Sequence, residues 1–280
     1  MGEGFFCKGV FVPFRRASLI LTGFFVLSLP AIQALADENS QFSWYPAVIE
    51  LFTSEGCNYA PAADRAVEAV LEEYPDTIVL SCHVTYHDRV GWTNGFSRGF
   101  CNERHRGYHR GLKLNRLYTP QLLINGTFET SGDRENILAS GVRMVSAEKM
   151  TVPINLILHG QILDIEFPEF NLNGLSADVW LFSYKAQART EIVSGPNEGR
   201  VVNYVNIVRN IEPLKSWDGR ALKVSVPVNR FETDGYAVVA QLHNYGRIVA
   251  AGRVERPGLV RKSVSTEPSI PFSRPISTSE

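Results

Sequence analysis

The segment from residue 46 to residue 85 constrains the fold most, because it predicts a strand, a helix and a second strand in close succession. Residues 46–52, PAVIELF, are apolar and branched enough for a buried strand. The amphipathic stretch that follows has helical spacing and ends before Pro75. Residues 77–85, TIVLSCHVT, suit a strand in a sheet that is covered on both faces. This order is typical of a parallel βαβ unit.

The downstream stretch TPQLLINGTFETSGDRENILASGVRMV, residues 119–145, predicts a hairpin and a helix. Two short β runs flank Asn125-Gly126, a dipeptide suited to a type I′ turn because both central residues need positive φ. Asp133 fits the N-cap of the helix. The preceding segment, residues 97–114, is interpreted as irregular to helical. The summed order β-α-β-α-β-β-α is the core order of the thioredoxin fold.

Beyond Met150 the pattern changes to an alternation of period two, with no helical segment. Seven short runs separated by Gly, Asn and Asp predict an all-β sandwich of about one hundred residues. The final residues are rich in serine and proline and are expected to be disordered. The predicted parts are an α/β thioredoxin-like domain at 46–149, a β-sandwich domain at 150–256 and a tail at 257–280.

The N-terminus is interpreted as a signal peptide over residues 1–36. Basic residues precede an apolar run at 17–30, and small residues end it near Ala36, where we expect cleavage. The run is about half the ~20 residues of a membrane-spanning helix, so we expect a soluble periplasmic or secreted protein. An uncleaved N-terminal anchor is the alternative. In that case the signal segment would be the only contact with the membrane.

The charge balance argues against nucleic acid as a partner. Lysine and arginine number 28 against 29 acidic residues, so the chain has no excess field that attracts phosphate backbones or acidic membranes.

Removal of the signal peptide would take Cys7 away and leave Cys57, Cys82 and Cys101. An odd number in an oxidising compartment implies at least one free or intermolecular thiol. Cys82 and Cys101 could form a disulfide, which would leave Cys57 as the lone free thiol. The alternative, two buried inert thiols, is favoured by the apolar strand around Cys82.

Cys57 follows the first predicted strand through a short turn and is expected to open a helix. Backbone N–H groups and the helix dipole stabilise a thiolate at such a position. Thr119-Pro120 immediately precedes the hairpin, where the proline of thioredoxin-like folds is cis and packs against the nucleophilic cysteine. We therefore predict Cys57 as nucleophile and Thr119-Pro120 as the loop that contacts substrate.

Four segments carry a resemblance to a known family, in order between residues 46 and 255. They are ELFTSEGCNYAPAAD, HVTYHDRVGW, YTPQLLINGT and GPNEGRVVNYVNIVRNIEPLKSWDG. On these blocks the sequence resembles the secreted, mainly bacterial thioredoxin-like proteins grouped as domain of unknown function twelve twenty-three. The resemblance implies the fold but no activity.

The chain departs from the family pattern at Ala60, where the second cysteine of Cys-x-x-Cys is expected. A dithiol oxidoreductase resolves its mixed disulfide with that second thiol, so the local two-cysteine cycle is not available. Three interpretations of Cys57 follow: a monothiol mechanism resolved by an external small thiol, resolution by a distal cysteine such as Cys101, or a lapsed site on a binding scaffold.

The leading functional hypothesis is an exported monothiol oxidoreductase that acts on a disulfide-bearing protein or a small thiol. The competing hypothesis is a non-catalytic binding or scaffold protein of the cell envelope. In the last family block no nucleophile or acid pair is evident, so its polar residues are expected to dock the sandwich onto the first domain.

Glu50 is an acid inside the first apolar strand, which demands an explanation because an unpaired buried carboxylate is costly. It could relay a proton beneath the thiol, or it could serve a structural role through hydrogen bonds across the sheet. We include it with Cys57, Thr119 and Pro120 in the predicted catalytic set.

A cluster of histidines lies in the middle of the chain and could suggest a metal site. The residues are His83, His87, Asp88, His105 and His109. Neighbouring arginines disfavour a divalent cation, so we expect no metal and no cofactor.

Overall fold

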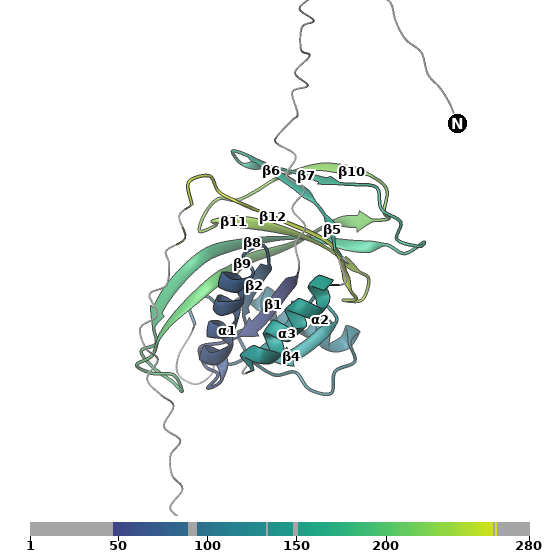
Figure 1. Ribbon diagram of the computed structural model, residues 1–280. Helices are drawn as coiled ribbons and strands as arrows, with labels where there is room; N and C mark the ends of the chain where they lie inside the picture. The colour runs from purple at the N-terminus through teal and green to yellow at the C-terminus, as the bar shows by residue number, and fades with distance from the viewer. Residues whose placement is uncertain (1–46, 89–93, 133, 148–150, 260, 262–280) are drawn as a thin grey trace, which may run out of the picture. The chain divides into compact units, whose positions relative to one another are not determined.

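The computed structural model describes residues 47–88, 94–132, 134–147, 151–259 and 261. The predicted signal peptide and residues 262–280 of the predicted tail lie outside these residues. Helices and strands follow one another as labelled in Figure 1. The helices are α1 (Ala60–Glu73), α2 (Gly99–Gly111) and α3 (Glu135–Ala147). The strands are β1 (Val48–Thr53), β2 (Ile78–His83), β3 (Gln121–Ile124), β4 (Phe128–Ser131), β5 (Val152–Pro153), β6 (Asn155–His159), β7 (Ile162–Phe167), β8 (Ala177–Glu191), β9 (Val201–Trp217), β10 (Leu222–Pro227), β11 (Gly235–Leu242) and β12 (Ile248–Glu255).

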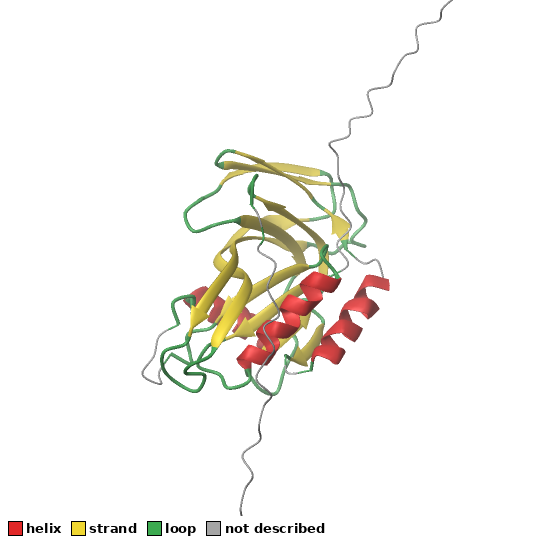
Figure 2. Ribbon diagram, turned by 60° about the vertical axis from the view of Figure 1, so that its left-hand side comes forward, coloured by secondary structure: helices red, strands yellow, loops and turns green. Residues whose placement is uncertain are grey.

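Most of the described strands belong to one nine-stranded sheet with the order β4-β3-β1-β2-β9-β8-β11-β12-β5. A second sheet has the order β10-β7-β6. Strand β1 pairs parallel with β2 and antiparallel with β3, and all six of its residues are buried. Figure 2 shows the helices against the curved strands. Within the described residues, no helix has the length and apolar character needed to cross a membrane.

The predicted strand-helix-strand unit is present as β1, α1 and β2. The helix places Ala63, Ala66 and Val67 in the core and ends before Pro75, as the sequence predicts. It begins at Ala60 rather than at Cys57. The reason is a tight turn in which the Ala60 N–H donates to the Cys57 carbonyl oxygen at 3.1 Å.

The hairpin turn has the predicted backbone, with φ of 47° at Asn125 and 73° at Gly126. The Asn125 side chain accepts the N–H of Val48 at 2.8 Å, and its backbone carbonyl accepts the N–H of Ile248 at 2.9 Å. One turn therefore binds both β1 and the start of β12. Helix α3 follows the hairpin, but the predicted N-cap Asp133 lies outside the described residues.

The seven predicted C-terminal runs become eight strands, because Ile154 separates β5 from β6. The seventeen-residue strand β9 reaches beyond this region and pairs with β2, where Ser81 lies opposite Ile207 in parallel register. The sequence predicts a domain boundary at residue 150, yet strands from both sides of that position share one sheet. Pairing between distant strands leaves no local signal, which is why the sequence did not indicate it.

Three large apolar clusters and a smaller one hold the described region together. One joins β1 and β2 to β8, β11 and β12 through residues such as Phe52, Leu80 and Phe182. A second packs α1 and α3 on the other face of β1. A third lies between the two sheets and contains Trp217, Leu163 and Val238. The smaller cluster surrounds Tyr204. The first cluster contains residues from both sides of the predicted boundary.

Replacing Gly126 by alanine should destabilise the fold by about 3 kcal/mol, because a left-handed backbone and a steric clash both oppose a side chain there. The added Cβ would lie 2.6 Å from the Gly246 carbonyl oxygen. Gly160 is a matched control, with φ of 61° and open space around its Cβ direction. Gly160→Ala should lose about 1 kcal/mol. Urea unfolding of both variants measures the difference, and equal losses would contradict the steric argument.

Candidate functional site

Cys57 lies in the tight turn between β1 and α1. Its N–H donates to the Ser54 carbonyl at 3.0 Å, and the Gly56 N–H donates to Ser54 Oγ at 3.2 Å. Gly56 permits a close approach of the backbone of His87, whose carbonyl oxygen would lie 2.9 Å from an added Cβ. Among the cysteines that the structure describes, Cys57 alone is free, and it is 7% exposed.

The thiol faces the loop before β3. The Cys57 S–H donates to the carbonyl oxygen of Thr119 at 3.3 Å, and the Thr119-Pro120 peptide bond is cis. The Thr119 hydroxyl lies 2.7 Å from Nε2 of His87. The structure therefore brings Cys57, Thr119 and Pro120 together, as the sequence predicts.

A chain of polar side chains continues from this loop, and its hydrogen positions follow from the chemistry of its members. Gln121 donates through its amide nitrogen to Glu129 at 2.7 Å, so its oxygen must accept the Nε2–H of His105 at 2.5 Å. His105 Nδ1 is then left to accept the Tyr86 hydroxyl at 3.2 Å. Burial lowers the pKa of His105 to about 4, which keeps this ring neutral.

Tyr86 connects that chain to the thiol. Burial raises the pKa of Tyr86 above its ordinary value, and the proximity of Cys57 raises it further. Its hydroxyl proton is directed to His105, so a protonated phenol lies in the electrostatic range of the sulfur.

The C-terminal half contributes two side chains to the thiol turn. The Asn197 amide nitrogen donates to the carbonyl oxygens of Glu55 and Cys57, each at 2.8 Å. The Tyr204 hydroxyl donates to Glu55 Oε1 at 3.0 Å. Sequence reasoning missed both residues. The signal that pointed to them was the block GPNEGRVVNY, whose polar residues had been assigned only to docking.

Two acids near this turn hold their protons unusually well. Burial raises the pKa of Glu55 to about 7; the Tyr204 hydrogen bond lowers it, and Asp88 raises it. Burial raises the pKa of Asp64 on α1 well above its ordinary value, with a further contribution from Glu55. The protonation of Glu55 therefore changes in the neutral pH range.

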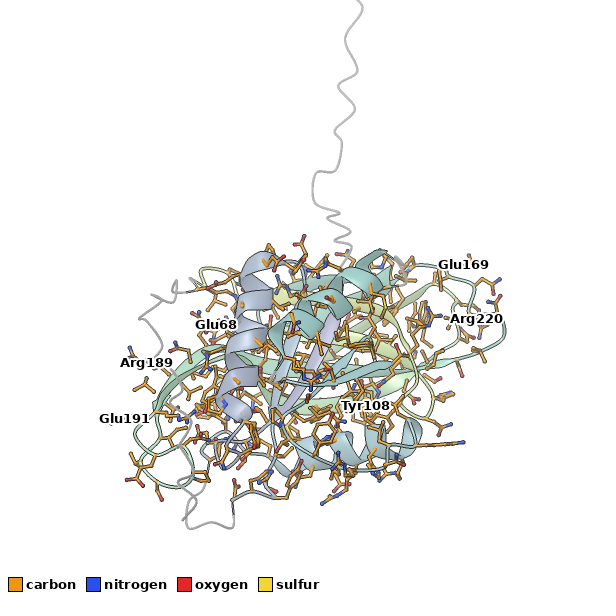
Figure 3. All side chains as sticks on the ribbon, turned by 60° about the horizontal axis from the view of Figure 1, so that its bottom comes forward. Glu68, Tyr108, Glu169, Arg189, Glu191 and Arg220 are labelled. Atoms are coloured by element: carbon orange, nitrogen blue, oxygen red, sulfur yellow. A yellow bond between two sulfur atoms is a disulfide. The ribbon has the colours of Figure 1, made fainter. Side chains whose placement is uncertain are left out.

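Glu50 does not join the thiol site, contrary to its place in the predicted catalytic set. Its carboxylate forms an ion pair with Arg104 and accepts the Tyr108 hydroxyl, at 1% exposure. Arg104 Nη2 lies 2.7 Å from Glu50 Oε1 and 3.1 Å from Gln241 Oε1. The structural alternative for Glu50 therefore applies, because its partners Arg104 and Tyr108 lie on α2 and are themselves bonded to Gln241 on β11. Figure 3 shows the position of Tyr108.

Arg104 is enclosed by aromatic rings. The distances from the guanidinium carbon to the ring centres lie between 4.9 and 5.7 Å for Phe182, Tyr108, Trp180 and Tyr245. Such faces attract a desolvated cation, so the rings help to offset the desolvation of the charge.

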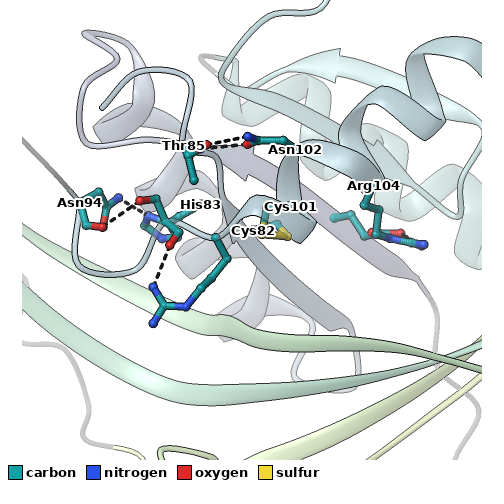
Figure 4. Close-up of a disulfide and its surroundings, with 10 residues drawn as sticks. Cys82, His83, Thr85, Asn94, Cys101, Asn102 and Arg104 are labelled. Carbon is teal, nitrogen blue, oxygen red and sulfur yellow. Dashed lines mark hydrogen bonds and ion pairs between the residues drawn. A yellow bond between two sulfur atoms is a disulfide. The ribbon is translucent and has the colours of Figure 1, made fainter. Parts of the chain in front are cut away.

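Cys82 and Cys101 form a disulfide that joins β2 to α2, with a Cα–Cα distance of 5.5 Å (Figure 4). The expectation of two inert thiols was wrong, because α2 packs against β2 and brings Cys101 beside Cys82. The pairing also excludes Cys101 as a free resolving thiol in this state.

Three histidines of the sequence cluster, His83, His87 and His105, have separate polar partners. His83 is fully buried with Nδ1 2.7 Å from the Asn94 amide nitrogen, and burial lowers its pKa to about 3. His87 contacts Thr119, and His105 lies between Tyr86 and Gln121. Within the described residues, no group of three or more His, Cys, Asp or Glu side chains is arranged to hold a metal.

Comparisons with known proteins place this geometry in context. A family model described as "Protein of unknown function (DUF1223)" matches residues 48–242. The crystal structure of a protein from Agrobacterium tumefaciens, a structural genomics target, is similar with a TM-score of 0.67. It shares 25% sequence identity, and the alignment covers 79% of this chain and 99% of that chain. No curated protein matches the sequence.

Replacing Glu50 by glutamine should destabilise the protein by about 3 kcal/mol, because it leaves the buried charge of Arg104 without its counter-charge. The double variant Glu50→Gln, Arg104→Met should recover part of that loss in urea unfolding. The rate at which iodoacetamide alkylates Cys57 should stay unchanged in folded Glu50→Gln. A slower alkylation would instead show that Glu50 acts on the thiol site.

Glu55 should make the protein less stable as the pH rises from about 4.5 to about 7. In that window the unfolded chain ionises Glu55, whereas the folded chain retains its proton, so unfolding is favoured. The Glu55→Gln variant stays neutral and keeps an acceptor for Tyr204, so its urea midpoint should fall less over the same range. Identical pH profiles for the two proteins would show that Glu55 is ionised in the fold.

Proposed function

Because the chain belongs to the DUF1223 family, we propose a function from its own site: single-cysteine thiol/disulfide exchange through Cys57 in an exported, thioredoxin-like protein. The observation that carries this proposal is the placement of a free thiol 3.3 Å from the carbonyl of Thr119, directly before Pro120. A sulfur in this position lies next to a loop that a substrate disulfide could approach.

The proposed reaction has two balanced exchange steps. The Cys57 thiolate attacks one sulfur of a substrate disulfide, forms a mixed disulfide and releases the other substrate sulfur as a thiolate. The thiolate of an external small thiol then attacks the substrate sulfur of this mixed disulfide. A new substrate–small-thiol disulfide forms, and Cys57 leaves as a thiolate.

The other cysteines support a single-thiol cycle. Position 60 carries alanine, which cannot resolve the mixed disulfide, and Cys101 is already bonded to Cys82. The second step therefore requires a thiol from outside the described chain. This requirement makes a small thiol or a second protein thiol the proposed partner, and it requires no metal or cofactor.

The order of β1, α1, β2, α2, the β3–β4 hairpin and α3 supports a thioredoxin-like assignment for this region. The predicted signal peptide supports a periplasmic or secreted location. In that compartment disulfides persist, so substrates for the proposed exchange are available.

One observation favours the alternative, a non-catalytic binding or scaffold protein. The thiol is 7% exposed and donates to a carbonyl, a bond that only the protonated sulfur makes. Attack on a disulfide requires that bond to open. The two hypotheses therefore differ in whether native Cys57 reacts with a disulfide.

The test incubates the purified native protein with glutathione disulfide and locates the adduct by peptide mass spectrometry. We expect a mixed disulfide on Cys57, its removal by added reduced glutathione, and no adduct on Cys57→Ser. Ala60→Cys serves as the gain-of-function comparison and should acquire insulin disulfide reductase activity, because a local second thiol can then resolve the adduct.

If native Cys57 stays unmodified but reacts after urea unfolding, and if Ala60→Cys also stays inactive, the exchange proposal fails and the scaffold hypothesis is supported.

A further inference from the structure

The connection between β8 and β9, residues 192–200, is a compact turn that we call the β8–β9 loop. The Ile192 N–H donates to the Arg200 carbonyl at 2.9 Å, and the Gly199 N–H returns to the Ile192 carbonyl at 2.7 Å. Within the loop, the Glu198 N–H donates to the Gly195 carbonyl at 3.1 Å. These bonds fix the backbone that presents Asn197.

Asn197 is 1% exposed, and its amide nitrogen is shared between two carbonyl groups of the thiol turn. These carbonyls belong to Glu55 and Cys57, the two residues that flank Gly56. An amide nitrogen carries two N–H donors, which matches this pair of acceptors. A single side chain from the C-terminal half thereby sets the orientation of two successive segments of the turn.

We propose that Asn197 is a positioning residue that raises the reactivity of Cys57, an inference that rests on the proposed thiol chemistry. The oxygens of the two carbonyls carry partial negative charge within the turn that bears the sulfur. The Asn197 donors hold and neutralise these oxygens, which favours the thiolate over the thiol. Removing the donors takes this partner from the Glu55 oxygen, leaves the Cys57 oxygen with the Ala60 N–H, and lets the turn relax.

Tyr204 fixes the same loop from its other end. Its hydroxyl is bonded to Glu55, while its ring lies against His83 with centres 4.8 Å apart and against Phe96 with centres 5.7 Å apart. Ile192 and Val202 belong to the same apolar cluster. The β8–β9 loop is therefore anchored on both sides of Asn197, so its amide reaches the thiol turn at a defined place.

This arrangement gives the C-terminal block a role in the thiol site itself. The hydrogen bonds of Asn197 and Tyr204 to the thiol turn place the β8–β9 loop and the start of β9 beside the end of β1 that bears Cys57. The proposed exchange site is thus completed by residues from both halves of the chain.

The test compares the pH profile of Cys57 alkylation in wild type, Asn197→Ala and Asn197→Ser. We expect Asn197→Ala to move the profile to higher pH and to lower the rate at pH 7 by about tenfold. Asn197→Ser keeps one donor, so its profile should lie between those of wild type and Asn197→Ala. Glu198→Gln is the matched control. Glu198 is the next residue along the chain and is exposed, so its replacement should leave the profile unchanged.

The pH profile distinguishes positioning from a merely structural role, which would lower the unfolding midpoint while the profile keeps its position. An unshifted profile in both folded variants would overturn the inference. If Asn197→Ala does not fold, Asn197→Ser alone decides. A shifted profile without glutathione adduct formation in wild type would contradict the proposed exchange and support the role of Asn197. Adduct formation with an unshifted profile would support the exchange and contradict the role of Asn197.

Discussion

The ion pair between Glu50 and Arg104 is the constraint on which much of the arrangement depends. It lies inside the protein, where an unpaired charge of either kind would strongly favour unfolding. Because Glu50 is on the central strand β1, Arg104 on α2 and Gln241 on β11, the three elements must meet with their polar atoms aligned. The aromatic rings around the guanidinium then fill the remaining contact surface. A placement of α2 that separates Glu50 from Arg104 would leave a buried charge unpaired, so the pair disfavours such packing.

The packing so selected brings together parts of the chain that lie far apart in sequence. With α2 held against β2, the disulfide closes and β9 extends the sheet beside β2. The thiol turn then meets two groups from distant parts of the chain: the Thr119 carbonyl from before β3 and the Asn197 amide from the β8–β9 loop. The Thr119 carbonyl accepts from the Cys57 sulfur, and the Asn197 amide donates to the Cys57 carbonyl. The local electrostatics at Cys57 are therefore a property of the whole sheet rather than of the segment that carries it.

The sequence predicted features governed by local rules. Apolar continuity located β1 and β2, Pro75 marked the end of α1, and Asn125-Gly126 identified a turn that needs two positive φ values. It also placed Cys57 near Thr119-Pro120, through the position that this dipeptide takes in a thioredoxin-like order of elements. It could not assign Glu50, because an acid in a strand has no visible partner until α2 is placed. Asn197 was missed for the same reason: a hydrogen bond across 140 residues leaves no periodic trace.

Ala60 has a consequence for how many electrons the chain can hold. Two neighbouring thiols give up two electrons when they form an internal disulfide, and they regain the electrons when that disulfide is reduced. With alanine at that position and Cys82 bonded to Cys101, Cys57 has no thiol to form a disulfide with among the described residues. A disulfide at Cys57 formed within this arrangement must therefore include a second molecule. Within the described residues, the thiol site therefore has no disulfide of its own, and the disulfide state of Cys57 depends on the molecule that is bonded to it.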